Sequence, residues 1–326
     1  MKDDQHRGPG AHDGHTDVHE VHTDPAALLA MTDAAEHERT GMSQVGSDGA
    51  VVDYRAGRTL PLLVELRRQL RRKRTQLLFG FVALLPIILV AAFEIGEAES
   101  DERGRGYVEL ATSSAPNFVV FVLFVSGTFL LPMIVALFFG DTIASEGSWS
   151  SLKYLLAIPV PRLRVLRQKA LASALLSAAT IALLPAMALV VGIIWYGTGP
   201  AVSPTGESVP FGDSMLVLVL AVAYVLVQLS WVAGLGLLLS VSMDAPLGAV
   251  GGAVLASIVS GILDQITALG AWRDFLPTHF SFAWIDLIAR DINWTDMASG
   301  ALSAICYTTV FGLLAARHFQ RKDITS

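Results

Sequence analysis

The stretch RTLPLLVELRRQLRRKRTQLLFGFVALLPIILVAAFEI, residues 58–95, decides the fold because a strongly basic segment leads directly into an apolar run. In residues 58–74, leucines recur at helical spacing and basic side chains occupy much of the remaining surface. That pattern is typical of an amphipathic helix at an anionic membrane face. Residues 76–95 reach the roughly 20 residues that a helix needs to cross the hydrocarbon core. The stretch therefore predicts a membrane protein rather than a nucleic-acid-binding one.

Five further apolar runs predict an all-α integral membrane protein with six transmembrane helices. The predicted spans are residues 76–95, 117–139, 171–196, 214–241, 247–268 and 299–316. Composition agrees, because 53% of the residues are hydrophobic and only 16% are charged, whereas soluble domains have about 25% charged residues. We expect a transmembrane domain over residues 75–317 and a short tail over 318–326.

Lysine and arginine are distributed unequally between the two sides of this topology. With six spans and a cytoplasmic N-terminus, sixteen of those that follow residue 53 lie on the inner face and four in the outer loops. Cytoplasmic loops of membrane proteins carry such an excess of positive charge. The sequence therefore predicts a multi-pass protein of the plasma membrane with both termini in the cytoplasm.

Residues 1–57 have few aliphatic side chains, and residues 1–53 alone hold eleven acidic against three basic residues. Such a segment buries too little apolar surface to offset the entropy of ordering, so we expect it to be disordered. It also carries histidines at spacings that would align on a helix, namely His12, His15, His19 and His22. These could hold a transition metal, or they could simply belong to a solvated polar tail.

The spans contain few polar groups of the kind that ion-driven transporters place near the membrane midplane. Gln228 is the most central strongly polar side chain, and either interior hydrogen bonding or contact with a substrate would explain it. In the fifth span, small residues recur every four positions, at Gly248, Gly252, Ala256 and Ser260. Such a stripe lets helices approach closely, either within the bundle or between two protomers.

The outer segment over residues 269–298 is unusually aromatic for a connector. Tryptophan and phenylalanine are enriched at the headgroup level of membranes. We therefore expect short interfacial or partly re-entrant helices before the last span.

The loop GDTIASEGSWSSLKYLLAIPVPRLRVLRQK, residues 140–169, has the features of a docking element. We expect Asp141 to end the second span and to cap a new helix, because a carboxylate accepts hydrogen bonds from free N–H groups. Residues 146–158 then follow a helical pattern with Trp149, Leu152 and Leu156 on one face, and Pro159 helps to stop it. A short amphipathic helix of this kind suits a groove on another protein.

This loop resembles that of ATP-binding-cassette (ABC) exporter permeases of the type 2 class, the ABC-2-type membrane proteins. Their pattern runs roughly D-x-I-A-x-E-x-x-x-G-T-L-x-x-L-L-x-x-P-V-x-R, with a Gly-Lys pair a few residues later. The matching residues are Asp141-Thr-Ile-Ala-Ser-Glu146, Leu152-Lys-Tyr-Leu155-Leu156, Pro159-Val160-Pro161-Arg162 and Lys169. The chain departs from the pattern at Ser150-Ser151, where the family has Gly-Thr, and at Gln168.

The resemblance implies a permease subunit that works with two copies of a separate ABC ATPase and with a second permease, identical or related. It makes residues 141–158 the coupling helix and 58–74 the connecting helix. The coupling residues that it implies are Asp141, Glu146, Trp149, Leu152, Leu156, Pro159, Arg162 and Lys169, although Arg162 and Lys169 could equally be anchors at the cytoplasmic face.

The chain itself has no motif of an enzyme. It lacks GxxxxGK[ST], GxSxG, HExxH and CxxC, so ATP and magnesium are expected on the partner subunit and no cofactor on this one. The exported cargo would be an amphiphilic or lipidic compound, a drug or a polysaccharide. The alternative is a membrane scaffold protein that docks a cytoplasmic partner without translocation.

Overall fold

The computed structural model describes residues 62–96, 102–148, 161–203, 206–288 and 292–321, and this part of the chain is mainly helical. The α-helices are α2 (Leu62–Leu70), α3 (Lys73–Gly96), α4 (Glu102–Thr112), α5 (Ala115–Gly127), α6 (Leu130–Ser148), α8 (Arg162–Tyr196), α9 (Phe211–Gln228), α10 (Ser230–Ser242), α11 (Pro246–Asp264) and α12 (Trp294–Arg321). Two 3₁₀ segments, η2 (Thr267–Phe275) and η3 (Ala283–Ile288), precede α12. Strands β1 (Ala201–Val202) and β2 (Ser208–Val209) pair antiparallel between α8 and α9.

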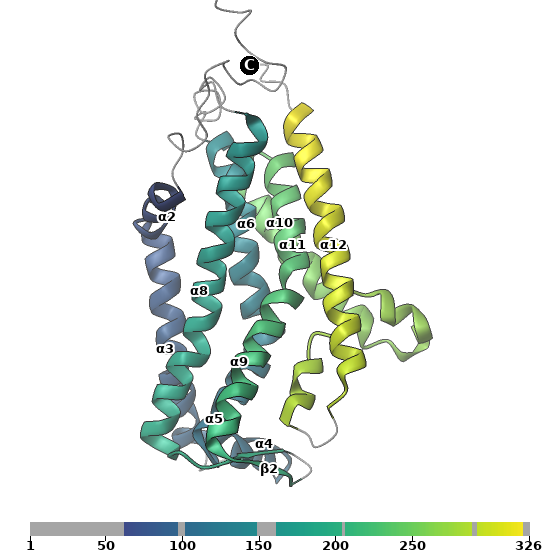
Figure 1. The fold of residues 1–326 in the computed structure, drawn as a ribbon. Helices are drawn as coiled ribbons and strands as arrows, with labels where there is room; N and C mark the ends of the chain where they lie inside the picture. Colours follow the sequence, from purple (N-terminus) through teal and green to yellow (C-terminus); the bar gives the residue numbers. More distant parts are fainter. Residues whose placement is uncertain (1–61, 97–101, 149–160, 204–205, 289–291, 322–326) are drawn as a thin grey trace, which may run out of the picture.

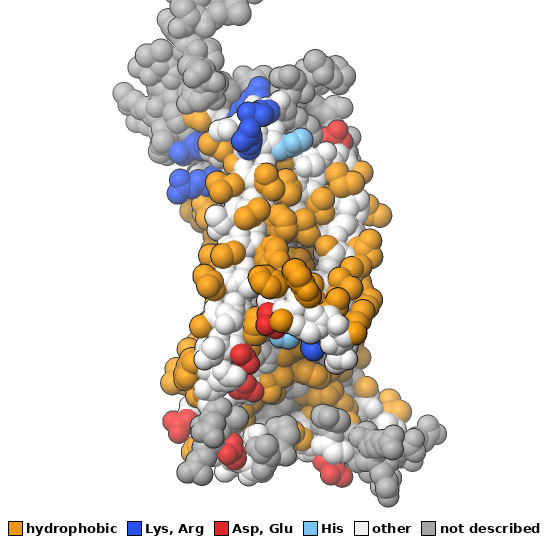
Figure 2. Space-filling model, turned by 90° about the vertical axis from the view of Figure 1, so that its right-hand side faces the viewer, with side chains coloured by type: hydrophobic (Ala, Val, Ile, Leu, Met, Phe, Trp, Pro, Cys, Tyr) orange, Lys and Arg blue, Asp and Glu red, His pale blue; other side chains and the backbone are white. Residues whose placement is uncertain are grey.

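The long helices form an elongated bundle with two chemically different ends (Figure 1). Helix α2, the start of α8 and the carboxyl end of α12 lie at one end, which we call the basic end after Arg67, Arg162 and Arg321. Helix α4 and the β hairpin lie at the other end. Figure 2 shows Lys and Arg side chains at the basic end and hydrophobic side chains over the middle of the visible face. An apolar surface of this extent is typical of contact with a membrane.

Five helical stretches are long and apolar enough to cross a membrane, or six if one bent pair is a single span. The five are Lys73–Gly96, Arg162–Tyr196, Phe211–Ser242, Pro246–Asp264 and Trp294–Arg321, and each overlaps a predicted span. The bent pair combines α5 with α6 up to Glu146, at an angle of 57°. The prediction of an all-α membrane protein is therefore confirmed, and the number of spans is five or six.

The predicted helix end at Asp141 is wrong. Helix α6 continues through Asp141 to Ser148, so Asp141 neither ends the second membrane helix nor caps a new one. Helix α11 ends at Asp264, before residue 268, and α12 extends beyond the predicted span 299–316 to Arg321.

Two elements at the end opposite the basic end were not predicted, namely α4 and the β hairpin. Asn117 joins them to α5: its Nδ2 donates to Leu110 O at 2.9 Å and to Val202 O at 3.0 Å, and Val202 N donates to its Oδ1 at 2.7 Å. Ser114 caps α5 by accepting a hydrogen bond from Asn117 N. One buried amide therefore fixes how three elements meet.

Helix α10 packs against α6, α11 and α12 at the centre of the bundle. Its buried apolar residues include Trp231, Val232 and Val241, which join a core shared with α5, α6 and α8. Glycines allow the closest approaches between helices. A Cβ atom at Gly140 of α6 would lie 3.0 Å from the backbone nitrogen of Val250 in α11, and one at Gly234 would lie 3.0 Å from Cα of Thr308 in α12. Small residues at such crossings are a general feature of membrane helix packing.

Gly140→Ala should lower the thermal unfolding temperature of the purified protein in detergent. The added methyl group would press on the backbone of Val250, which a rotamer change cannot relieve, and overpacking of this kind costs about 1–3 kcal/mol. Gly251→Ala is the matched control on α11, because nothing lies within 4 Å of a Cβ atom there. The control should be neutral or slightly more stable. Equal unfolding temperatures for the two variants would contradict the close α6–α11 contact.

Candidate functional site

Helix α2 packs against the bundle through Leu66 and through polar side chains. Leu63 and Leu70, which belong to the predicted leucine stripe, are 78% and 43% exposed, whereas Gln69 is 6% exposed. Gln69 Nε2 donates to Glu65 Oε1 at 2.9 Å, and Glu65 in turn lies 3.5 Å from Lys169 Nζ of α8. Leu63 and Leu70 are therefore free to contact lipid while Leu66 and the polar side chains hold α2 on the protein.

Four charged side chains from three helices meet where α2, α6 and α8 come together at the basic end. Arg68 Nη2 of α2 lies 2.8 Å from Glu146 Oε1 of α6 and 2.8 Å from Glu65 Oε1. Lys169 Nζ of α8 lies 3.1 Å from Glu146 Oε1 and 3.5 Å from Glu65 Oε1. We call these four residues the charge quartet. Two carboxylates and two cations compensate one another there, which is what burial of charge requires.

Burial and the neighbouring charges shift the pKa values of Glu65 and Arg68 in the quartet. Burial acts to raise the pKa of Glu65, but the hydrogen bond from Arg68 and the positive charge of Lys169 outweigh it, so the pKa lies below its ordinary value. Burial also acts to lower the pKa of Arg68, and its hydrogen bonds to Glu65 and Glu146 raise that pKa above the ordinary value instead. Glu65 and Arg68 therefore stay ionised at neutral pH.

Asp141 forms a second ionic contact next to the quartet. Its buried carboxylate accepts a hydrogen bond from Arg72 Nη1 at 2.9 Å and pairs with the guanidinium of Arg74. The N–H groups that a cap at Asp141 would have satisfied, those of Ile143 and Ala144, donate to Ser240 Oγ of α10 at 2.9 and 3.0 Å. Asp141 therefore holds the basic link between α2 and α3, and Ser240 supplies the acceptor that we expected from Asp141.

Of the remaining predicted coupling residues, Arg162 lies in the described part of the chain and four others do not. Arg162 Nη1 donates to the carbonyl oxygen of Gln320 at 3.0 Å, so it links the start of α8 to the last turn of α12. Trp149, Leu152, Leu156 and Pro159 lie outside the described residues, as do the histidines His12, His15, His19 and His22. The structure thus brings Asp141, Glu146 and Lys169 together at the base of the loop.

A second notable region is the segment between α11 and α12, residues 265–288, which leaves the bundle partway along its length (Figure 1). Side chains of the bundle satisfy its irregular backbone. Gln228 Nε2 donates to Pro277 O at 2.7 Å, Tyr224 Oη to Phe280 O at 2.6 Å and Tyr307 Oη to Phe275 O at 2.7 Å. Gln228 therefore fixes this segment, whether or not it also contacts a substrate.

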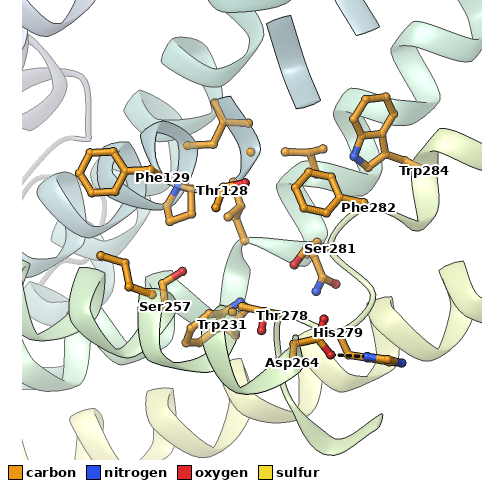
Figure 3. Close-up of a pocket in the computed structure, with 18 of the residues that line it drawn as sticks. Thr128, Phe129, Trp231, Ser257, Asp264, Thr278, His279, Ser281, Phe282 and Trp284 are labelled. Atoms are coloured by element: carbon orange, nitrogen blue, oxygen red, sulfur yellow. Dashed lines mark hydrogen bonds and ion pairs between the residues drawn. The ribbon is translucent and has the colours of Figure 1, made fainter. Parts of the chain in front are cut away.

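This segment closes one side of a cavity of about 500 Å³ (Figure 3). The bend between α5 and α6, the start of α10 and the last turns of α11 form the other walls. Asp264 and His279 lie at its rim, with His279 Nδ1 2.5 Å from Asp264 Oδ1. Arg273 Nε is 3.5 Å from the same oxygen, and His279 Nε2 is 3.4 Å from Asp274 Oδ1.

The small-residue stripe of α11 packs within the protein at the points that the structure describes. A Cβ atom at Gly248 would lie 3.0 Å from Met243 Cε, and one at Gly252 would lie 3.0 Å from Leu239 Cδ1. Ser260 Oγ lies 2.7 Å from Thr278 Oγ1 of the segment described above. Ala256 is only half-buried. A role of this stripe between protomers stays a prediction.

Comparison with known proteins agrees with this architecture. The described helices are those of a multi-pass membrane protein. A model of the family described as ABC-2 family transporter protein matches residues 62–245, more than half of the chain, so the chain belongs to that family. It is the membrane-spanning subunit of an ABC transporter and not the ATPase. A search of curated protein sequences found no match.

Sequence reasoning did not single out Glu65, Ser240, Tyr224 or His279. Glu65 had a usable signal, because it is the one acidic residue in the basic stretch 58–74. An isolated carboxylate in such a segment suggests that a cation from elsewhere faces it. The other three act on backbone groups or side chains far away in the sequence, and local patterns do not contain that information.

Lys169→Met should destabilise the protein by about 2–3 kcal/mol. The substitution keeps most of the length of the buried side chain but removes its charge, so Glu65 and Glu146 are left to share Arg68. The expected cost is below the about 3–5 kcal/mol of a fully broken buried pair because Arg68 still compensates the carboxylates. Arg71→Met is the control, because Arg71 is exposed and no ion pair is found for it among the described residues. Thermal unfolding in detergent measures both. A Lys169→Met protein as stable as the control would refute the quartet as a structural contact.

Proposed function

We propose that this chain is the permease of an exporter and that the ATPase moves it through loop 140–169. The observation that carries the proposal is the charge quartet, because it joins both ends of this loop to each other and to α2. Glu146 lies before the loop's central part and Lys169 lies after it, and their side chains are 3.1 Å apart. A force applied to the loop would act on α2, α6 and α8 together.

The charge distribution supports the orientation that this mechanism needs. Under the positive-inside rule the basic end lies in the cytoplasm, together with both termini, in the plasma membrane. The ATPase would then dock on the loop and on α2, whose cationic side chains Arg67 and Arg71 are exposed. Two ATPase subunits and a second permease, identical or related, would complete the transporter, with ATP and magnesium bound by the ATPase subunits.

Export is the direction implied by the resemblance of the loop to type 2 exporters. An apolar bundle suits amphiphilic or lipidic compounds and drugs as cargo. Polysaccharides are a further cargo class that the family resemblance implies. The apolar residues that surround the cavity, such as Leu123, Val225 and Ile258, support an amphiphilic or lipidic cargo.

Glu146→Gln should reduce transport-coupled ATP hydrolysis about fivefold or more while the complex still assembles. The variant removes the charge that links the loop to Arg68 and Lys169 but keeps the shape of the side chain, and coupling energies between sites are typically about 1–3 kcal/mol. Trp149→Ala, on the expected docking face, should have a similar effect. The measurement is cargo-stimulated ATPase activity of the co-purified complex in lipid nanodiscs.

Glu109→Gln is the matched control, because this exposed glutamate belongs to α4 at the opposite end of the bundle. It should leave the coupled rate unchanged. Normal coupled rates for Glu146→Gln and Trp149→Ala in an intact complex would reject the loop as the coupling path. Failure of any ATPase to co-purify in mild detergent would instead favour the scaffold interpretation.

A further inference from the structure

The cavity behind residues 277–284 has the lining of a ligand site, and we propose that it binds an apolar molecule that carries a protonated amine. Its volume of about 500 Å³ lies within the range of small-molecule sites, about 300–1,000 Å³. This proposal rests on the proposed function and deepens it, because it names a class of molecule that the permease would take.

Two hydrogen-bond acceptors on residues that line this cavity have no hydrogen-bond partner among the described residues. Gln228 is 2% exposed, its Nε2 is used by Pro277 O, and its Oε1 has no hydrogen-bond partner among the described residues. Asp264 uses Oδ1 for His279 and Arg273, and no contact to its Oδ2 is found in the described part of the chain. A ligand with N–H groups would supply a donor to Asp264 at the rim of the cavity.

The charges at the rim favour a cationic ligand over an anionic one. Arg273 and Asp274 flank the Asp264–His279 pair at the rim. Arg273 is not part of the cavity wall, whereas Asp264 is. The charged group that a ligand would meet first is therefore a carboxylate.

Aromatic rings add a second feature that suits a cation. Phe129, Trp231, Phe282 and Trp284 line the cavity, and Figure 3 shows them around the space that Asp264 and His279 border. Trp231 and Trp284 are almost fully buried, at 3% and 1% exposure. Aromatic faces attract cations and also hold apolar groups, and the attraction increases when the site is desolvated. An alkyl or aryl amine satisfies the acceptors, the charge and the rings together.

The test uses the purified permease in nanodiscs of phosphatidylcholine, without ATPase, and two fluorescent probes. Dansylcadaverine carries a primary amine that is charged at neutral pH, and its N-acetyl derivative has the same dansyl group and linker without the charge. We expect saturable binding of the amine, with empty nanodiscs subtracted, and about tenfold weaker binding of the acetylated probe. Equal binding of the two probes would overturn the proposal.

Two matched pairs of variants locate the site. Asp264→Asn should weaken binding of the amine about tenfold and leave the acetylated probe unchanged, whereas Asp274→Asn, at a side chain 63% exposed, should bind like the wild type. Gly261→Phe should abolish binding, because nothing lies within 4 Å of a Cβ atom at this cavity-lining glycine, so the ring enters the cavity. Gly251→Phe, on the same helix and outside the cavity, should bind normally.

Unchanged amine affinity in Asp264→Asn or in Gly261→Phe would overturn the site. The glycine pair remains informative if Asp264→Asn does not fold, because Gly261 has no part in the ion pairs. Since binding needs no ATPase, a permease that binds the amine but is not driven by ATP would separate failure of the proposed coupling from failure of this site.

Discussion

Every backbone polar group within the apolar part of this protein needs a partner from the protein, because hydrocarbon offers none. Regular helix meets that requirement almost everywhere. Where the chain is irregular, side chains from other helices supply the missing bonds. Tyr224 and Gln228 donate to the carbonyl oxygens of residues 280 and 277. Specific polar side chains of the bundle therefore hold the irregular backbone of residues 277–280.

The same reasoning governs the charges. Lys169, Glu146 and Asp141 are almost fully buried, and each is compensated by residues from α2 or the start of α3. Removing α2 would take Arg68 away from Glu146 of α6 and Glu65 away from Lys169 of α8. A helix that sequence analysis places at the membrane surface is thus also a structural part of the bundle, and its exposed leucines and arginines remain available for lipid or for a partner.

The length of the apolar runs located the membrane helices, because five of the six predicted runs overlap a helix long enough to cross a membrane and the remaining one overlaps the bent pair of α5 and α6. Boundaries were less predictable. Asp141 was expected to cap a helix on the basis of local chemistry, but the tertiary contacts with Arg72 and Arg74 use its carboxylate instead. The loop motif pointed to Glu146 and Lys169 without revealing that they form an ion pair. The cavity depends on residues from five segments, and no local pattern contains that arrangement.

Helix α6 connects the two regions that matter for the proposals. It begins at the bend beside the cavity, where Leu131 and Pro132 form part of the wall, and it ends with Asp141 and Glu146 at the basic end. The distance along the helix from Leu131 to Glu146 is about 22 Å at 1.5 Å per residue. A helix of this length moves largely as a unit, because compressing it would break backbone hydrogen bonds. Displacement of Glu146 would therefore reach the cavity wall, and the bend of 57° between α5 and α6 is the place where the chain can absorb the motion.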